Sequence, residues 1–354
     1  MQLEMIHLLK GAMLGMGSFY SQVFADSILR LPGVSLVGAC PLGQRDETLK
    51  ANTGKTRAEY CEAFEAPLFE DAETMVEATQ PDFAFVTAWD RVKADWALWA
   101  LDHGLDVYVS KPLTNGVASA RKLAEAEAAH PERLCGALDP GRYDGAIAAA
   151  KAKVDAGALG KLLSARVYIQ HGKAPLGPFE DSVEFGEGAG GAEYTLGVYA
   201  ADMLGWFIGS TPTRVWCEAA NLNSPGFPWP DTMYGTVRYA DGRIGGMSII
   251  FSTDCAAPQW EIELVGDKGI LRTHQACYEA VLWPSGYGEP TCFYRMQNDV
   301  IFGAVASWVD SVATRGKPDL TFGEALDVIK VCAGWQRSGR LGLAFDLIKQ
   351  EGEL

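Results

Sequence analysis

The sequence predicts an α/β domain built on a parallel sheet, followed by an α+β domain with a large, mostly antiparallel sheet. A length of 354 residues fits two domains of ordinary size. Before about residue 137, short apolar runs alternate with amphipathic segments of helix length, as in βαβ units. Beyond about residue 140, strand candidates follow one another across tight turns. We therefore expect one domain over residues 1–137 and a second over 138–354.

Short apolar runs bounded by Gly, Pro or Asp predict the strands of the first domain. These runs are 8–14, 34–40, 83–87, 107–109 and 134–137. Helices are expected between them, at about 19–31, 71–78, 91–103 and 115–129. In the last segment, Val117 and Leu123 lie on an apolar stripe beside charged residues, which is typical of a helix covering a sheet.

The second domain is expected to open with a helix and a strand and then to form an open sheet with helices on one face. A helix at about 143–156 precedes a strand at 162–170, a glycine-rich loop at 172–191 and a helix at 192–207. Six further strands are predicted at 213–222, 232–239, 243–251, 259–265, 269–274 and 278–283. Tight turn signals such as Asp241-Gly242 indicate antiparallel neighbours. Helices at about 299–315 and 322–336 close the chain.

Composition and charge exclude several kinds of partner. The chain has 30 Lys and Arg residues against 45 Asp and Glu residues, and the net charge of −15 disfavours nucleic acid. No apolar run approaches the ~18 residues that a membrane helix needs. The N-terminus lacks the features of a signal peptide. We expect a soluble, cytoplasmic protein with no membrane partner.

The cysteines and histidines do not predict a metal site. Eight cysteines and five histidines are scattered along the chain. No C-x-x-C, H-x-x-x-H or H-E-x-x-H pattern occurs among them. We expect reduced, mostly buried thiols.

A glycine-rich segment stands where the first strand meets the first helix. In G-x-G-x-x-G loops of this kind, helix N-terminal N–H groups cradle a pyrophosphate. Gly15 and Gly17 match the first two glycines, Ser18 and Phe19 open the helix, and Tyr20 replaces the third glycine. We expect Gly15, Gly17, Ser18 and Phe19 to contact a dinucleotide. A glycine-rich turn without a ligand is the alternative.

The end of the second strand carries no acid to bind the ribose of NAD. A carboxylate about 20 residues after the glycines is usual there, but the first acid in this chain is Asp46. Arg45 would instead meet the 2′-phosphate of NADP. The alternative is that Arg45 opens a solvated helix together with Asp46 and Glu47, so the choice between NAD and NADP stays open.

Lys111 follows the strand predicted at 107–109, within the sequence Ser110, Lys111, Pro112. Ligands of doubly wound sheets lie outside the carboxyl ends of the strands, so this lysine is a candidate site residue. Pro112 also favours an extended conformation at Lys111. The alternative is an ordinary solvated lysine.

A polar face is predicted on the helix at 192–207. Thr195, Tyr199 and Asp202 are spaced i, i+4 and i+7 and therefore share one face of the helix. This face would line a cleft. Alternatively, Thr195 and Tyr199 are partly buried in the core and Asp202 makes a local hydrogen bond.

Together these segments resemble the glucose-fructose oxidoreductase / inositol dehydrogenase / MocA family over nearly the whole chain. The family has an N-terminal Rossmann domain, a Glu-Lys-Pro motif and a G-G-G…D-x-G-x-H-x-x-D helix. The last two correspond to residues 110–112 and 190–202 here. Weaker similarities lie at 141–144, 155–161, 263–269 and 338–340. The resemblance implies NAD or NADP as cofactor and hydride transfer at a hydroxyl or carbonyl of a sugar, polyol or sugar acid.

The resemblance also implies catalytic roles. Lys111 would orient the substrate hydroxyl, and Tyr199, at the family's histidine position, would move the proton, as tyrosine does in a few branches. Phenols have a pKa near 10, which a lysine ammonium within a few ångströms lowers. As a general acid, Tyr199 needs no such lowering. Thr195 replaces the family's first aspartate, whereas Asp202 retains the second.

Further contacts are implied by position. Asp90 stands where the family often has an asparagine near the nicotinamide, although an N-cap of the helix at 91–103 is an equal alternative. Arg142 and His171 stand where family members commonly touch substrate, and a cation there suits a carboxylate. The family also implies a homodimer or homotetramer, formed through the exposed face of the second sheet.

Two other functions remain open. One is a redox-neutral isomerase or lyase that uses bound NAD transiently, which would turn over without net NADH or NADPH. The other is a non-catalytic dinucleotide or sugar sensor. Tyr20, Ser110 and Thr195 all depart from the family pattern and motivate this second alternative.

Overall fold

The computed structural model describes residues 8–172, 191–224, 229–253, 259–274, 278–286 and 288–353. These residues form two compact units. The first comprises the described residues up to Thr114 together with Ser119–Leu138 and Ile301–Ala325. The second comprises Asn115–Ala118, the described residues of Asp139–Val300, and those from Leu326 onward.

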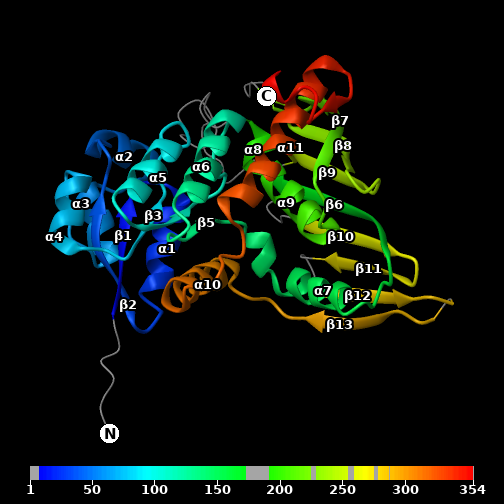
Figure 1. Ribbon diagram of the computed structural model, residues 1–354, viewed down its shortest axis with the longest axis horizontal. Helices are drawn as coiled ribbons and strands as arrows, with labels where there is room; N and C mark the ends of the chain where they lie inside the picture. The colour runs from blue at the N-terminus through cyan, green and yellow to red at the C-terminus, as the bar shows by residue number, and fades with distance from the viewer. Residues whose placement is uncertain are drawn as a thin grey trace, which may run out of the picture. The chain divides into compact units, whose positions relative to one another are not determined.

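The first unit is built on a five-stranded sheet with the order β2-β1-β3-β4-β5 (Figure 1). All neighbouring strands are parallel, which confirms the predicted α/β class. The strands are β1 (Leu9–Leu14), β2 (Val34–Cys40), β3 (Phe83–Val86), β4 (Asp106–Val109) and β5 (Cys135–Ala137). Their carboxyl ends therefore meet at one edge of the sheet, where ligands of doubly wound folds bind.

Seven helices accompany this sheet in the described part of the chain. They are α1 (Phe19–Ile28), α2 (Asp46–Thr53), α3 (Arg57–Phe64), α4 (Ala72–Thr79), α5 (Lys93–Asp102), α6 (Val117–Ala129) and α10 (Val300–Thr314). The segment after Arg45 is where the solvated-helix interpretation expected α2, whereas α3 was not predicted. Thr56 and Glu59 form a capping box at the start of α3. Arg57 pairs with Asp46 of α2.

An aromatic cluster forms the core of the first unit. Trp308 of α10 stacks on Tyr108 of β4, with ring centroids 5.0 Å apart. Phe83 lies edge-on to Trp308 at 6.2 Å. Gly136 makes this packing possible, because a Cβ there would lie 2.6 Å from the Tyr108 ring. The chain thus returns to its first unit at Ile301–Ala325. A single division at residue 137 does not include this return.

The second unit contains a nine-stranded sheet with the order β13-β12-β11-β10-β6-β9-β8-β7-β14. Only β6 and β9 pair in parallel among these described strands. The mostly antiparallel sheet is therefore confirmed, with β13 and β14 added. The strands are β6 (Leu162–Gly172), β7 (Pro212–Ala220), β8 (Thr232–Tyr239), β9 (Ile244–Thr253), β10 (Gln259–Gly266), β11 (Gly269–His274), β12 (Glu279–Pro284), β13 (Thr291–Arg295) and β14 (Phe345–Asp346).

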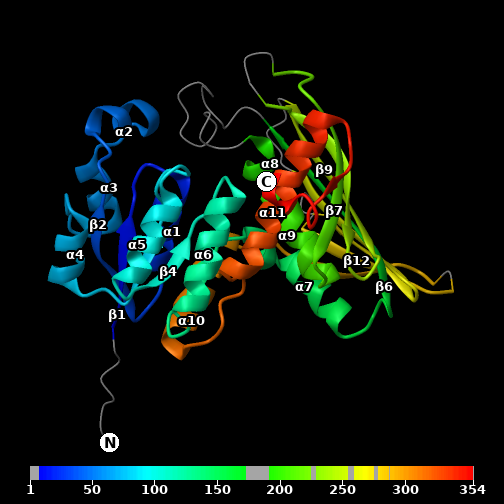
Figure 2. The same cartoon turned by 45° about the horizontal axis from the view of Figure 1, so that its top comes forward.

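Helices cover one face of this sheet (Figure 2). They are α7 (Gly145–Asp155), α8 (Ala192–Thr195), α9 (Gly197–Ile208) and α11 (Phe322–Leu341). Two 3-10 turns, η1 (Pro140–Tyr143) and η4 (Glu351–Glu353), also belong to this unit. Glycines let them approach closely, since a Cβ at Gly235 would meet Trp335 and one at Gly245 would meet Leu204.

The helix expected at about 143–156 is confirmed as α7. The Asp144 carboxylate caps it by accepting hydrogen bonds from the N–H groups of Ala146 and Ile147. The helix expected at 192–207 is divided at Leu196 into α8 and α9. Most of the loop expected at 172–191 lies outside the described residues.

Candidate functional site

Gly15 occupies a position that only glycine fits. Its φ is +100°, and a Cβ there would lie 2.5 Å from the backbone nitrogen of Ala88. The Thr87 hydroxyl donates a hydrogen bond of 3.0 Å to the Gly15 carbonyl. Gly17 also has a positive φ, of +78°. The loop after β1 therefore packs directly against the end of β3. At this sheet edge Gly15 presents backbone atoms and no side chain.

Ser18 and Phe19 start helix α1 directly after this loop. The Ser18 hydroxyl caps the helix by accepting a hydrogen bond of 3.1 Å from the Ser21 N–H. Phe19 is exposed, whereas Tyr20 is buried against Phe24, with ring centroids 5.9 Å apart. The four predicted cofactor contacts thus lie together at a helix N-terminus, the arrangement that suits a pyrophosphate.

Gln44 holds the glycine-rich loop and was missed by the sequence analysis. Its amide oxygen accepts from the Met16 N–H at 2.9 Å, and its amide nitrogen donates to the Met16 carbonyl at 2.7 Å. Both residues are buried. A lone glutamine gives no sequence signal, although it lies in the segment where the expected acid is absent.

Arg45 is exposed and occupies the N-cap position of α2, without a side-chain capping bond. Asp46 follows in the first turn and pairs with Arg57 at 3.1 Å. Hydrogen bonds from Arg57 lower the pKa of the Asp46 carboxyl. This matches the solvated-helix interpretation of the segment, and a contact between Arg45 and a 2′-phosphate stays a prediction.

Asp90 and the segment carrying Lys111 meet at a buried lysine that the sequence analysis missed. The Lys93 ammonium lies 2.6 Å from Asp90 Oδ1 and 3.0 Å from the Pro112 carbonyl oxygen. The N-cap alternative for Asp90 was wrong, because Val92 occupies that position of α5. The i, i+3 spacing of Asp90 and Lys93 at a strand end is the signal that could have found the pair.

Lys111 is half-buried after β4 and lies close to the start of α1. Its Nζ is 5.6 Å from the centroid of the Tyr20 ring, a distance at which a cation interacts with an aromatic face. Ser110 beside it is buried, and the Lys111–Pro112 peptide is cis. The first unit thus brings Lys111 close to helix α1, which follows the glycine-rich loop.

Thr195, Tyr199 and Asp202 do not share one continuous helix. Thr195 ends α8 and donates a hydrogen bond of 3.2 Å to the Gly191 carbonyl, whereas Tyr199 and Asp202 lie in α9. All three are buried. The Tyr199 ring packs against Trp260, with centroids 4.6 Å apart. Leu196 interrupts the helix between Thr195 and Tyr199. The burial of these two residues matches the alternative that they belong to the core.

Arg142 forms a bidentate pair with the buried Asp202. Arg142 Nε lies 2.8 Å from Asp202 Oδ2, and one terminal guanidinium nitrogen lies 2.6 Å from Oδ1. The side chains are only 11% and 2% exposed. The alternative of a local hydrogen bond for Asp202 was wrong, since the partner is 60 residues away. The structure thus joins two residues that were predicted separately.

His171 lies near the end of β6 and is half-buried. Its Nδ1 is 2.9 Å from the Gly172 carbonyl oxygen, and its ring stacks on Phe251 at 5.9 Å between centroids. Its substrate contact stays a prediction.

Glu193 is a second residue that the sequence analysis missed. It is 2% exposed, and burial raises the pKa of its carboxyl to about 7, against the lowering effects of Arg340 and Gln336. Its Oε2 has no hydrogen-bond partner among the described residues. An acid two residues after the glycine pair, at the start of an apolar helix, is the signal that could have found it.

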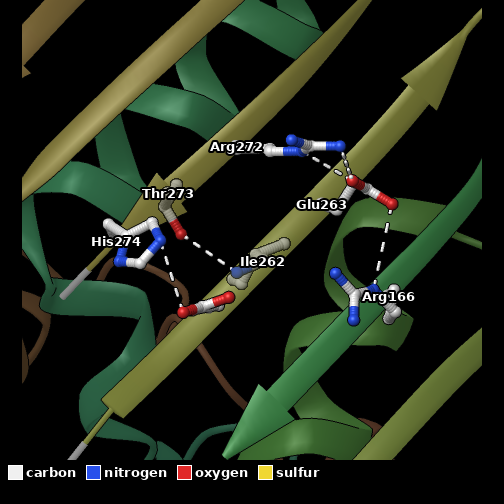
Figure 3. A pocket seen from close by; sticks show the side chains of 7 residues that line it. Arg166, Ile262, Glu263, Arg272, Thr273 and His274 are labelled. Atoms are coloured by element: carbon white, nitrogen blue, oxygen red, sulfur yellow. Dashed lines mark hydrogen bonds and ion pairs between the residues drawn. The ribbon is translucent and has the colours of Figure 1, made fainter.

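A pocket of about 190 Å³ lies on β6, β10 and β11, and no predicted site residue lines it (Figure 3). Its charged side chains pair with one another: Glu263 with Arg272 at 2.6 Å and with Arg166 at 3.8 Å, and Glu261 with His274 at 3.3 Å. The pocket is therefore lined by a cross-strand ion-pair network.

The described residues contain no group of three or more His, Cys, Asp and Glu side chains that could hold a metal ion. No described helix is long and apolar enough to cross a membrane. Six cysteines are free thiols, of which only Cys292 is exposed, while Cys255 and Cys277 lie outside the described residues.

The fold and the glycine-rich loop define a dinucleotide-binding α/β unit joined to an α+β unit. Two family models match the chain: "Oxidoreductase family, NAD-binding Rossmann fold" over residues 9–136, and "GFO/IDH/MocA C-terminal domain" over residues 147–272. Together they span most of the chain. The chain belongs to the GFO/IDH/MocA family of oxidoreductases, which confirms the resemblance.

Curated relatives match parts of the chain. An inositol 2-dehydrogenase of Pseudomonas fluorescens is 34% identical over 101 residues, covering 28% of this chain and 30% of its own length. A scyllo-inositol 2-dehydrogenase (NAD(+)) of Bacillus subtilis is 24% identical over 222 residues, covering 62% of this chain and 60% of its own length. The chain thus aligns with less than two thirds of either relative.

Solved structures share the whole fold. An oxidoreductase from Agrobacterium radiobacter in complex with NAD+, L-tartaric acid and magnesium has a TM-score of 0.82 at 15% identity, covering 98% of this chain and 100% of that chain. A myo-inositol 2-dehydrogenase from Lactobacillus plantarum has a TM-score of 0.76 at 21% identity, covering 96% and 99%. At these identities the likeness establishes the fold.

Proposed function

We propose that the chain is an NAD- or NADP-dependent dehydrogenase or reductase that acts on CH–OH groups. The substrate class is a sugar, polyol or sugar acid. The close approach of Gly15 to the Ala88 backbone, at the N-terminus of α1, carries the proposal, since this shape suits a pyrophosphate. The inositol dehydrogenases among the relatives and the tartrate complex of the Agrobacterium protein support the substrate class.

The proposed roles follow the chemistry of the side chains. The bound nicotinamide supplies the hydride donor or acceptor. Gly15, Gly17, Ser18 and Phe19 bind the phosphates of the dinucleotide.

Other residues of the first unit orient the reactants. Arg45 and Asp90 contact the cofactor at the adenosine and nicotinamide sides. Lys111 contacts both the cofactor and the substrate, and its ammonium donates to the substrate oxygen and so orients the reacting carbon. An ammonium suits this task because it stabilises negative charge that develops on that oxygen.

Residues of the second unit move the proton and hold the substrate. The Tyr199 hydroxyl donates a proton to the substrate oxygen during reduction and accepts it during oxidation. Arg142, His171, Thr195 and Asp202 hold the remaining substrate groups. Arg142 is already paired with Asp202, so the two act as one preorganised unit.

We also propose a cytoplasmic homodimer or homotetramer, with no nucleic-acid or membrane partner. The exposed Trp216 and Tyr234 lie on adjacent strands of the second sheet and support assembly through that sheet. Sedimentation of the purified chain tests this part: a monomer at micromolar concentration rejects it.

Turnover with a panel of polyols, sugars and sugar acids tests the proposed activity, using NAD+ and NADP+ in parallel. We expect steady formation of NADH or NADPH with at least one compound class. Turnover without net reduced cofactor would identify the redox-neutral alternative. Cofactor binding without turnover on any compound would identify a sensor.

The proton-transfer role is tested by Tyr199→Phe, with Tyr194→Phe as the matched control. Both tyrosines are buried, and Tyr194 has no proposed role in the reaction. We expect kcat to fall about 10²- to 10⁴-fold for Tyr199→Phe. The Tyr194→Phe variant should stay close to the unsubstituted enzyme. Unchanged kcat in Tyr199→Phe rejects the role.

A further inference from the structure

Lys93 is a lysine in an unfavourable place. Its side chain is only 2% exposed, and it is the first residue of helix α5. A positive charge near a helix N-terminus opposes the helix dipole, and a buried ammonium loses its hydration. Both costs must be offset by acceptors that the ammonium contacts.

Four oxygens surround this ammonium. Asp90 Oδ1 and the Pro112 carbonyl are the nearest, at 2.6 and 3.0 Å. The carbonyl oxygens of Ser110 and Lys111 lie at 3.3 and 3.4 Å. An ammonium has three N–H donors, so two hold the nearer oxygens and the third is shared by the farther ones. The Lys93 ammonium thus binds the backbone carbonyls of three consecutive residues, 110–112.

The two attached segments belong to neighbouring strands. Asp90 follows β3 and residues 110–112 follow β4, and these strands are paired in parallel. Lys93 thus bridges the two carboxyl ends at the edge where a doubly wound sheet binds its ligand. The Asp90 carboxyl is 12% exposed, so its charge is directed to Lys93 within the protein.

We propose that Lys93 is a positioning residue for the reaction. It fixes the backbone of residues 110–112, and with it the direction of the Lys111 side chain. The proposal rests on the role assigned to Lys111 in the proposed function. The Lys111 ammonium stands at the end of a long flexible chain, so a small backbone shift is amplified at its Nζ. A displacement of about 1 Å at a reacting group is enough to reduce catalysis about 10²-fold.

The geometry also requires lysine at this position. The compact ammonium reaches oxygens that converge on it from one carboxylate and three successive carbonyls. A guanidinium is a planar fork matched to two oxygens of one partner. Lys93→Arg therefore keeps the charge and loses the convergent bonds.

The test compares Lys93→Met and Asp90→Asn with Asp95→Asn as the matched control. Asp95 is an exposed acid in the same first turn of α5. For Lys93→Met we expect kcat to fall about 10²-fold while the Kd for the cofactor changes less than about threefold. Lys93→Arg and Asp90→Asn should each lower kcat about tenfold. Asp95→Asn should match the unsubstituted enzyme.

A second measurement needs no substrate. Acetic anhydride labels lysines according to their accessibility, and mass spectrometry compares Lys111 with the exposed Lys122 of α6 in the same sample. Release of the backbone in Lys93→Met should raise the labelling of Lys111 relative to Lys122 about threefold or more. Asp95→Asn should leave that ratio unchanged.

Each outcome decides the proposal. A labelling ratio within twofold of the unsubstituted chain overturns it, whether or not kcat falls, because the loss would then have another cause. Raised labelling with unchanged kcat overturns the link to the reaction. If the unsubstituted chain turns over no substrate, the proposed function fails while the labelling still tests the anchoring of Lys111. If Lys93→Met does not fold, Lys93→Arg carries the same comparison, because Lys93 itself has no proposed contact with cofactor or substrate.

Discussion

Each unit contains a cation–carboxylate pair with one buried partner, Lys93 in the first unit and Asp202 in the second, and the two pairs are built differently. In the second unit, Arg142 directs two donors at the two oxygens of Asp202. In the first unit, Lys93 gives Asp90 one short contact and directs its other donors at backbone carbonyls. The first arrangement joins two side chains, and the second fixes a chain segment. Their removal should therefore affect different properties of the protein.

The largest effect on stability is expected for Asp202→Ala. The substitution leaves the Arg142 guanidinium buried without its carboxylate, and breaking a buried pair in this way costs about 3–5 kcal/mol. Urea unfolding of the full chain, followed by tryptophan fluorescence, measures the change in the free energy of unfolding.

The control replaces both partners. Arg142→Met with Asp202→Leu removes both charges and keeps apolar volume, so it should restore most of the lost stability. A loss below about 1 kcal/mol for Asp202→Ala alone would contradict a stabilising role for the Arg142–Asp202 pair.

Glu193 differs from both pairs. It is a buried carboxyl of the second unit, and its Oε2 has no hydrogen-bond partner among the described residues. Burial raises the pKa of Glu193 from its ordinary value of 4.5 to about 7. Between these values the folded chain holds the proton and the unfolded chain has lost it. Stability should therefore fall as the pH rises from about 4.5 through 7, by a total of about 3 kcal/mol.

Glu193→Gln isolates this contribution. The amide cannot ionise, so the difference in unfolding free energy between the variant and the unsubstituted chain should grow from pH 5 to pH 8. Urea titrations at several pH values measure that difference. A difference that does not change with pH would mean that Glu193 ionises normally in the folded chain.

The strands of the first unit were predictable because their signals are local. Each is a short apolar run, and Gly15 and Gly17 mark the turn at the end of β1. Helix α3 also carries a local signal, the capping box of Thr56 and Glu59, but it is short and partly polar and was missed. Strand β13 was missed because its residues alternate little between buried and exposed.

The residues of the candidate site show the same difference between local and long-range signals. Residues that belong to a motif, such as Lys111, could be chosen from sequence. Their partners could not, because Gln44 acts on a loop 28 residues away and Arg142 on a carboxylate 60 residues away. The return of Trp308 to the first sheet is a contact of the same long-range kind. Sequence periodicity reports on neighbours along a helix or strand, whereas these contacts are set by the fold.

The smallest loss of stability is expected for Gln44→Ala. This substitution tests whether a second side chain of the first unit, besides Lys93, anchors a backbone segment at the site. The substitution leaves the buried N–H and carbonyl of Met16 without their partners, at a cost of about 1–3 kcal/mol. Part of this cost should appear as weaker cofactor binding, measured by titration calorimetry with NAD+ and NADP+. The Gln44→Glu variant is the stricter comparison, since its carboxylate accepts from the Met16 N–H and cannot donate to the Met16 carbonyl. Equal affinity in all three chains would restrict the backbone-anchoring device to Lys93.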